Sequence, residues 1–330
     1  MLFSVLIPNL GYHKFLEECL ASVFSQKTNN LFEYEVIVCD QSDSDDYVKI
    51  CSLISSLQKG TGKVIIYHQP ERRVLLARHS LVQKAKGDYI VFIDSDDIVS
   101  ETYLLNLFQL IRLEREPDFI IHNFKHFSNN CITEQTFPEN ISNNILDYFL
   151  LTDYLNPVCN KVFKRSLYSK NDYQIFDVTN GDDWILSYPM MFKAKNFFFS
   201  NNFLGYFYRS NSNSITHKIS YEVALKTIEY RIPFLKGKTL NSFQDSIFTK
   251  YKIGLFSHLL SRLIVSKEDR KRVMDFIKTT RHIFFEILYS SNKGLLTKRE
   301  KITFSLLKRK KYHLLLFLYQ TRRFMKKQTL

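Results

Sequence analysis

Three features are missing from this sequence of 330 residues, and each absence excludes a class of protein. Its five cysteines are scattered and form no Cys-x-x-Cys pair, so we expect free thiols in a reducing compartment and neither a disulfide framework nor a zinc site. The longest apolar stretch near the C-terminal end, Leu314–Tyr319, is far below the roughly 20 residues that a membrane span needs. The apolar segment Met1–Pro8 lacks a basic region and stops at a proline, which predicts a buried strand and not a signal peptide. Together these absences predict a cytoplasmic protein.

The plentiful residues are apolar and, in one part of the chain, basic. Hydrophobic residues make up 45% of the chain and aromatic residues 15%, which is enough for a buried core and argues against disorder. Residues 1–220 carry 21 Lys and Arg against 25 Asp and Glu, whereas residues 221–330 carry 25 against 8. These balances of −4 and +17 predict a domain boundary near residue 220 and a polyanionic surface as the partner of the basic end.

The first part of the chain alternates between short β-branched runs and helical patterns. The runs predict four strands, at Ser4–Ile7, Glu35–Cys39, Lys63–Tyr67 and Tyr89–Ile93. Apolar residues at helical spacing fall between them, within 15–24, 48–57 and 75–82. Strands that alternate with helices predict an α/β fold with a parallel sheet covered on both faces, and a ligand outside the carboxyl ends of the strands.

The pattern then becomes mixed and finally helical. We expect a helix over 104–113, a strand over 119–127, a helix that begins near Asp182, and one or two strands within 196–208. Beyond residue 220 the chain is predicted to be almost wholly helical, with segments over 248–265 and 269–289. Thr297–Glu300 is a capping-box pattern that opens a further helix.

An acidic cluster, Asp94–Asp97, directly follows the fourth predicted strand. Carboxylates at the carboxyl end of a parallel strand point into the ligand crevice, where their oxygens can hold a hard divalent cation that neutralises a diphosphate. The alternative is an acidic cap before a helix, but three aspartates in four residues exceed what a cap needs. The cluster therefore predicts a metal site.

Several ordered motifs over about 220 residues resemble the family 2 glycosyltransferases, which have the GT-A fold. The matching segments are Ser4–Asn9, Phe15–Val23, Val36–Asp40, Ala77–His79, and Ala85–Tyr89 leading into Asp94–Asp97, which resembles the DxD signature of the family. The chain departs from the pattern at Gln41 and Ser42, where the family often has an acidic residue and a glycine, and at His79, where it has asparagine. The resemblance implies a GT-A sheet flanked by helices, with a helical extension after residue 220.

For the donor, the resemblance implies a site in the first half of residues 1–220, about 1–100. Asp40 is implied to contact the nucleotide base, with Pro8 and Asn9 in the adjoining turn. Asp94 and Asp96, with Ser95 between them, are implied to hold Mn²⁺ or Mg²⁺ and the donor diphosphate, while Asp97 caps the next helix. Arg78 is a forked donor suited to phosphate or ribose oxygens, and its alternative is a surface salt bridge.

For the acceptor, the resemblance implies a site in the second half, about 100–220. Asp183 is implied to be the general base, with Asp182 beside it and with Trp184 and Tyr188 as apolar neighbours that raise its pKa. The alternative is an acidic helix N-terminus. The segment that contains Asn160 and Lys161 resembles one beside the acceptor site of the family. In the segment Tyr208–His217, Arg209 is a candidate phosphate clamp and His217 a candidate metal ligand, although a lone loop histidine is as often merely solvated.

The basic end is amphipathic as well as charged. Between Lys293 and Leu330 there are 12 Lys and Arg and a single acid, Glu300. Basic amphipathic helices of this kind can lie on an anionic membrane surface, so we expect peripheral association with the inner face of the membrane. Packing on the catalytic domain with a solvated basic face, and nucleic-acid binding, are the alternatives.

These interpretations predict a glycosyltransferase of the hexosyltransferase class. It would move a sugar from a nucleoside diphosphate donor, expected to be UDP, to a hydroxyl of a surface glycan of the lipopolysaccharide or capsule type. One carboxylate base and no candidate nucleophile predict inversion. A nucleotidyltransferase is an alternative, but Pro8–Tyr12 is not the glycine-rich and basic phosphate loop that it needs. A nucleic-acid-binding protein would leave the acidic cluster without a role.

Overall fold

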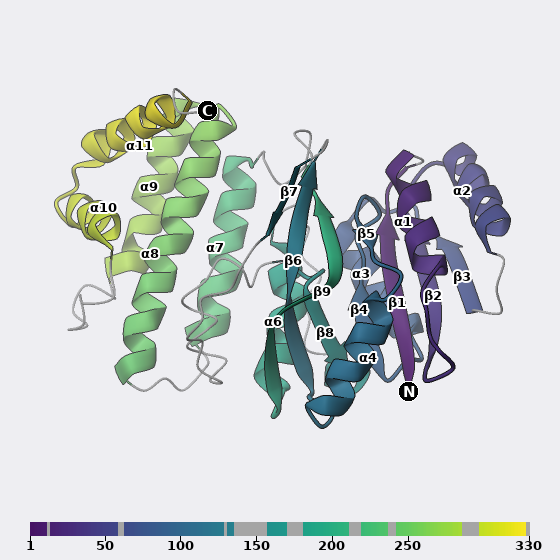
Figure 1. The fold of residues 1–330 in the computed structure, drawn as a ribbon. Coiled ribbons are helices and arrows are strands. Elements are labelled where there is room, and N and C mark those ends of the chain that lie inside the picture. The colour runs from purple at the N-terminus through teal and green to yellow at the C-terminus, as the bar shows by residue number, and fades with distance from the viewer. Residues whose placement is uncertain are drawn as a thin grey trace. The chain divides into compact units, whose positions relative to one another are not determined.

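The computed structural model describes residues 1–11, 14–58, 63–128, 131–134, 157–169, 181–210, 219–236, 242–285 and 297–327 (Figure 1). Contacts between these residues divide them into two compact units. We call the described residues up to 210 the sheet unit and those from 219 onward the helical unit.

The first half of the sheet unit is a parallel α/β layer. Its elements are β1 (Leu2–Asn9), α1 (Lys14–Phe24), β2 (Glu33–Asp40), α2 (Ser44–Leu57), β3 (Lys63–His68), α3 (Val74–Lys84) and β4 (Tyr89–Phe92). Strand β1 pairs in parallel with β2 and β4, and β2 pairs in parallel with β3. The four strands and three helices expected here are confirmed.

The second half adds strands of both directions, so the whole sheet is mixed. Its elements are β5 (Ile98–Val99), α4 (Tyr103–Leu113), β6 (Phe119–Ser128), β7 (Cys131–Glu134), β8 (Lys161–Lys164), α6 (Asp182–Lys193) and β9 (Phe197–Arg209), with a 3₁₀ turn at Arg165–Leu167. The strand order is β3-β2-β1-β4-β8-β6-β9-β5, with β7 paired to β6. Strand β8 is antiparallel to both β4 and β6, which ends the parallel layer beside β4.

The central strands are apolar on both faces because helices cover the sheet on both sides. Phe3, Val5, Leu6 and Ile7 of β1 are all fully buried, as expected for a covered parallel strand. The predicted apolar stripe of α1 is buried as well, with Leu16, Cys19, Leu20 and Val23 against this core. Cys19, Cys39 and Cys159 are buried free thiols, in agreement with the sequence expectation.

A glycine fixes the entry into β4 and therefore the position of the acidic cluster beyond it. The Gly87 N–H donates to Ser4 Oγ at 2.8 Å, and a Cβ atom on Gly87 would lie only 2.5 Å from the Ser4 nitrogen. No larger residue fits without moving β1.

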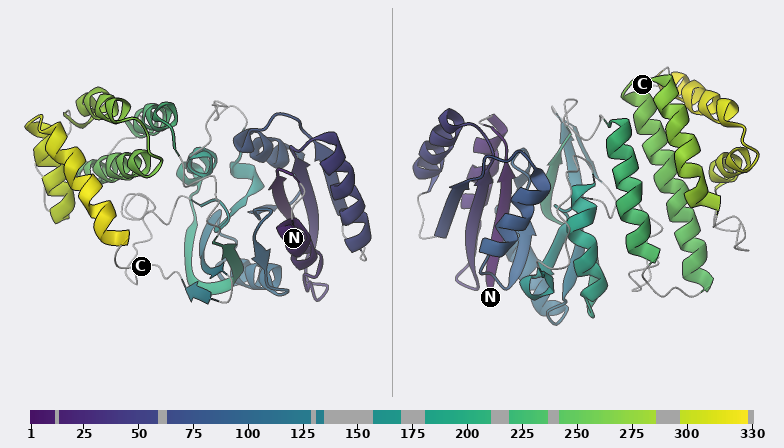
Figure 2. Two further views of the ribbon diagram at one scale, coloured as in Figure 1. Left: turned by 90° about the horizontal axis from the view of Figure 1, so that it is seen from above. Right: turned by 180° about the vertical axis from the view of Figure 1, so that it is seen from behind.

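The helical unit consists of α7 (Tyr221–Lys236), α8 (Ser242–Val265), α9 (Arg270–Phe285), α10 (Lys298–Lys308) and α11 (Tyr312–Lys327) (Figure 2). It has its own apolar core, in which the rings of Phe256 and Phe276 stack with centroids 5.8 Å apart. The predicted capping box is present, since Thr297 and Glu300 satisfy each other's backbone N–H groups. Within the described residues, none of the helices combines the length and apolarity needed to cross a bilayer.

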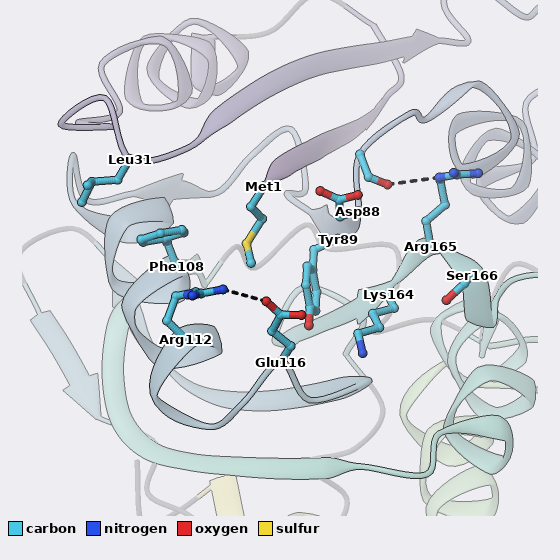
Figure 3. Close-up of a pocket in the computed structure, with 11 residues that line it drawn as sticks. Met1, Leu31, Asp88, Tyr89, Phe108, Arg112, Glu116, Lys164, Arg165 and Ser166 are labelled. Carbon is cyan, nitrogen blue, oxygen red and sulfur yellow. Dashed lines mark hydrogen bonds and ion pairs between the residues drawn. The ribbon is translucent and has the colours of Figure 1, made fainter.

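A cavity of about 670 Å³ lies at the amino ends of the strands, away from the acidic cluster (Figure 3). Asp88 and Tyr89, at the beginning of β4, line it together with Phe108. Its cations already have partners: Arg112 pairs with Glu116 at 2.8 Å, and Lys164 pairs with Asp118 at 2.9 Å. Open α/β sheets bind their ligands at the opposite edge, outside the carboxyl ends of the parallel strands, where the acidic cluster lies.

Candidate active site

The carboxyl ends of β1 and β2 bring Asn9 and Asp40 side by side. The two residues are register partners, and Asn9 Nδ2 donates to Asp40 Oδ1 at 2.7 Å. The other carboxylate oxygen, Asp40 Oδ2, accepts from the N–H and the hydroxyl of Ser42. Ser42 was a departure from the family pattern, yet it supports the carboxylate that the pattern singles out. Pro8 is buried in β1, opposite Cys39.

One acceptor atom at this position has no partner among the described residues. Asn9 Oδ1 is buried, in a residue that is only 3% exposed, and accepts no hydrogen bond from the part of the chain that the structure describes. Asp40 is fully buried beside it. Buried polar atoms are nearly always hydrogen-bonded, so an unsatisfied acceptor next to a carboxylate suits a ligand with an N–H donor.

Arg78 joins three carboxylates from two parts of the chain. Its guanidinium contacts Asp94 Oδ1 at 2.9 Å through one nitrogen and both Asp182 and Asp183 through another. The alternative for Arg78, a salt bridge, is therefore present, but the side chain is only 5% exposed, so the salt bridges are buried and not on the surface. Because this arginine lies in α3, it connects the turn after β4 to the first turn of α6.

Asp183 has the electrostatics of a group that can accept a proton near neutral pH. Burial raises the pKa of its carboxyl to about 7, although the positive charge of Arg78 opposes the rise. Asp182 and Asp183 also lie in the first turn of α6, so the alternative of an acidic helix N-terminus is present in the structure as well. The helix begins after Gly181, whose φ of 90° favours glycine.

Three residues expected on the acceptor side are buried beneath the site and do not line an open surface. Trp184 is fully buried, with its ring centroid 3.8 Å from that of Tyr188. Asn160 and Lys161 are also fully buried, and Lys161 Nζ donates to Asn160 Oδ1 at 3.0 Å. Burial lowers the pKa of Lys161 to about 7, against the attraction of Asp183. These side chains support the carboxylates from within the fold.

Asp97 is a structural anchor and not a helix cap, which corrects the sequence expectation. Its carboxylate is 1% exposed and accepts from the Tyr206 hydroxyl at 2.6 Å and from the Arg209 N–H at 2.7 Å. The next helix, α4, begins only at Tyr103. The Tyr206 oxygen also accepts from the Asp94 N–H at 3.3 Å, so one tyrosine of β9 holds both ends of the acidic turn.

Arg209 is likewise occupied by the protein, contrary to a free phosphate clamp. Its Nε donates to the Asp96 carbonyl at 2.6 Å, and its guanidinium pairs with Glu18 at 2.5 Å. The rings of Phe15 and Phe127 lie within 4.2 and 4.3 Å of the guanidinium carbon. Ser95 is half-buried within the same turn.

The acidic turn has the ligand chemistry of a hard-cation site. Among the described residues, one oxygen each of Asp94 and Asp97 and the Cys159 thiol lie within 4.8 Å of one another. Burial, followed by the charges of Asp94 and Asp96, raises the pKa of Asp97 well above its usual range, while burial and Asp94 raise that of Asp96 to about 6. Burial also keeps the Cys159 thiol protonated, so the carboxylates are the fitting ligands for Mg²⁺ or Mn²⁺. His217 lies outside the described residues.

Comparison with known proteins decides the family. The profile described as Glycosyl transferase family 2 matches residues 4–171, which is more than half of the chain. The chain belongs to this family. It is therefore a glycosyltransferase, as the sequence predicted, and the nucleotidyltransferase alternative is set aside.

Several curated relatives of this family 2 glycosyltransferase come from bacteria. Glycosyltransferase GlyG of Streptococcus pneumoniae serotype 4 is 26% identical over 229 residues, covering 65% of this chain and 72% of GlyG. The Escherichia coli UDP-Glc:alpha-D-GlcNAc-diphosphoundecaprenol beta-1,3-glucosyltransferase WfaP is 25% identical over 219 residues, covering 65% of this chain and 80% of WfaP. Other curated relatives are much longer, and the chain spans only 17% and 30% of two of them.

The fold also matches a solved structure. The crystal structure of Staphylococcus aureus TarS residues 1–349 in complex with UDP-GlcNAc superposes with a TM-score of 0.73 and 17% identity, covering 98% of this chain and 92% of that one. This match confirms the expected GT-A sheet with C-terminal helices.

Sequence reasoning on the family motifs missed Tyr206. It lies in an aromatic-rich strand whose sequence, Phe197–Arg209, contains seven aromatic residues, so nothing in the pattern singles it out. Its role appears only because β9 runs past the acidic turn, 109 residues from Asp97 along the chain.

Proposed function

We propose that this family 2 glycosyltransferase moves a hexose from a UDP-sugar to a hydroxyl of a bacterial surface polymer or of its lipid-linked precursor, with inversion. The observation that carries the proposal is the Arg78 bridge, because it places the acidic turn that suits a donor diphosphate beside the carboxylate that suits a general base. The names of the relatives support the substrate classes, since WfaP is named for a UDP-glucose donor and a diphosphoundecaprenol acceptor. TarS was solved with UDP-GlcNAc.

The donor base would lie against Asn9 and Asp40. Asp40 is held rigidly by Asn9 and Ser42, so its carboxylate is preorganised. The unsatisfied Asn9 Oδ1 adds a second acceptor. Uracil has a ring N–H that such acceptors can bind, which supports UDP as the nucleotide.

Asp94 and Asp96 would hold Mn²⁺ or Mg²⁺. A dication bound there neutralises the donor diphosphate and stabilises the charge of the departing UDP. Asp97 keeps the turn in place, because its two carboxylate oxygens accept from Tyr206 and Arg209 of β9. The Arg209 side chain adds a bond to the Asp96 carbonyl.

Asp183 would take the proton of the acceptor hydroxyl. The hydroxyl oxygen then attacks the anomeric carbon, the bond from that carbon to the diphosphate breaks, and UDP leaves with the bonding electrons. A pKa of about 7 suits this step, because the carboxylate is largely ionised at slightly alkaline pH yet remains a useful base. Direct displacement by one base gives inversion.

We further propose that residues 1–220 form the catalytic domain, with its nucleotide half at about 1–100 and its acceptor half at about 100–220. The basic residues 221–330 would associate with the anionic inner face of the membrane, where a lipid-linked acceptor is presented. Their excess of 25 Lys and Arg over 8 Asp and Glu supports this partner.

Calorimetry and a turnover assay on three variants test the proposal. Asp183→Asn should bind UDP-GlcNAc within about threefold of the unsubstituted protein and lose at least about a hundredfold in turnover. Asp96→Asn should lose the Mn²⁺-dependent part of UDP binding. Asp45→Asn, an exposed residue of α2, is the matched control and should change neither. Undiminished turnover in Asp183→Asn would overturn the assignment of the base.

A further inference from the structure

The turn between α10 and α11 presents a dense positive charge. Lys308, Arg309, Lys310 and Lys311 are consecutive, and all four side chains are exposed. The chain reverses there, with Lys310 in the left-handed region at φ 54°. The single acid of residues 298–327, Glu300, accepts from the Thr297 N–H in the capping box at the other end of α10. No carboxylate of either helix therefore neutralises this turn.

Apolar side chains stand beside the cations, on the outer face of α11. Leu314 is 48% exposed and Phe317 is 58% exposed, and their spacing of three residues places them on one face of the helix. This face is not the one that packs in the core, where Leu315, Leu316 and Tyr319 are buried. Helices α10 and α11 form one outer layer of the helical unit, drawn in yellow in Figure 2.

The helix that carries these residues is fixed to the unit. The Tyr319 hydroxyl donates to Ser257 Oγ of α8 at 2.7 Å and bonds to Thr303 Oγ1 of α10 at 3.1 Å. The exposure of Leu314 and Phe317 is thus set by a packed core and not by a loose helix. A rigid surface with cations around exposed apolar side chains is the arrangement that binds a lipid interface.

We propose that this corner, Lys308–Lys311 with Leu314 and Phe317, docks on an anionic bilayer. The cations would lie among the lipid phosphates while Leu314 and Phe317 enter the interface. The inference deepens the proposed function and rests on its membrane-linked acceptor. An anionic bilayer is favoured over a soluble polyanion because of the exposed apolar side chains. A lipid interface removes the phenyl ring of Phe317 from water, which is favourable, whereas a soluble polyanion offers no apolar surface to cover it.

The charge part of the proposal is tested by flotation of the full chain with vesicles. Vesicles of phosphatidylcholine with one third phosphatidylglycerol should bind it, and vesicles of phosphatidylcholine alone should bind it much more weakly. Each cation near an anionic surface strengthens binding about fivefold, so Lys310→Glu with Lys311→Glu should weaken binding at least about 25-fold. The control, Lys63→Glu with Lys86→Glu, reverses two exposed charges of the sheet unit and changes the net charge equally. This control should weaken vesicle binding far less than the Lys310 and Lys311 pair does. An equal loss in the two pairs would overturn the proposal, because it would show that the net charge of the protein, and not this corner, determines binding.

The apolar part separates a bilayer from a soluble polyanion. Leu314→Gln with Phe317→Gln keeps every charge and should weaken vesicle binding roughly tenfold while leaving binding to polyphosphate unchanged. The control, Val48→Gln with Leu113→Gln, removes two apolar residues of the sheet unit that are 63% and 75% exposed. It should leave vesicle binding and polyphosphate binding unchanged. Vesicle binding that does not respond to the first pair would overturn the proposal.

The catalytic proposal can fail separately. UDP binding, measured by calorimetry without vesicles, should be the same in all four double variants as in the unsubstituted protein. If the protein binds vesicles as expected but not UDP, the docking inference stands and the proposed donor falls. If the protein binds UDP but no vesicles, the proposed donor stands and the docking inference falls.

Discussion

Replacing Asp183 by asparagine should stabilise the metal-free protein at pH 8 while it removes activity. The folded protein holds the Asp183 proton more tightly than the unfolded chain does, because burial raises the pKa of this carboxyl to about 7. The ionised carboxylate therefore lowers the free energy of unfolding. This penalty is absent below about pH 4, grows as the pH rises to about 7, and is constant above that pH. Asparagine does not ionise, so the variant escapes the penalty.

The structure bounds the size of the gain. A carboxyl whose pKa rises from about 4 to about 7 costs the folded state up to about 4 kcal/mol when it ionises. The Asp183 side chain is 31% exposed, so water screens part of this cost. Arg78 loses one partner but keeps Asp94 and Asp182. We therefore expect the variant to gain about 1–2 kcal/mol at pH 8 and nothing near pH 4.

The assay is urea unfolding in EDTA from pH 4.5 to 8.5, followed by tryptophan fluorescence. Trp184 is the only tryptophan of the chain and is fully buried next to Asp183. Its signal reports the unfolding of the sheet unit without a contribution from the helical unit. Urea is uncharged, so it does not screen the interaction under test.

Asp118→Asn is a control with the opposite sign. Burial would raise the pKa of Asp118, but the Lys164 ammonium and the N–H groups of Lys195 and Asn196 lower it. Its stabilisation is present above the unfolded pKa and is lost as the pH falls, so this variant should be least stable, relative to the unsubstituted protein, at pH 8. The reasoning on Asp183 is refuted if Asp183→Asn destabilises the protein at pH 8, or shifts stability equally at every pH, while Asp118→Asn behaves as described.

Three further variants probe other parts of the structure. Asp40→Ala should weaken UDP binding by about ten- to a hundredfold in calorimetry, since it removes the acceptor proposed for the base, and should also lower the free energy of unfolding by about 1–3 kcal/mol, since the buried donors of Asn9 and Ser42 lose their acceptor. Tyr206→Phe should lower the free energy of unfolding by about 1–3 kcal/mol, because the buried Asp97 carboxylate loses one donor, and a loss below 0.5 kcal/mol would contradict the anchoring role. Thr297→Ala should destabilise the helical unit by about 1 kcal/mol, followed by circular dichroism, because the capping box with Glu300 is lost.

Local sequence patterns predicted most of the fold because the relevant interactions are local. The strands β1 to β4 are apolar runs that helices cover on both faces, and the stripe of α1 recurs at helical spacing. The antiparallel insertion of β8 between β4 and β6 was not predictable in this way, since Lys161–Lys164 is a four-residue run whose partners lie far along the chain. Strand direction depends on the path of the connecting chain, so the sequence of so short a segment does not predict it.

The candidate site shows the same limit at the level of single side chains. Asp94 and Asp97 are three residues apart and chemically identical, so by residue type they are equivalent, and only the family resemblance gave Asp97 a separate role, as a helix cap. Tyr206 breaks this equivalence, because its hydroxyl donates to the carboxylate of Asp97 but accepts from the backbone of Asp94. The Asp94 carboxylate instead faces Arg78, a cation that it shares with the first turn of α6. Asp97, hydrogen-bonded on both oxygens by neutral donors, stabilises the turn, whereas Asp94, which shares the cation Arg78 with other carboxylates, remains available to a second cation. This difference arises only when β9 and α6 fold against the end of β4.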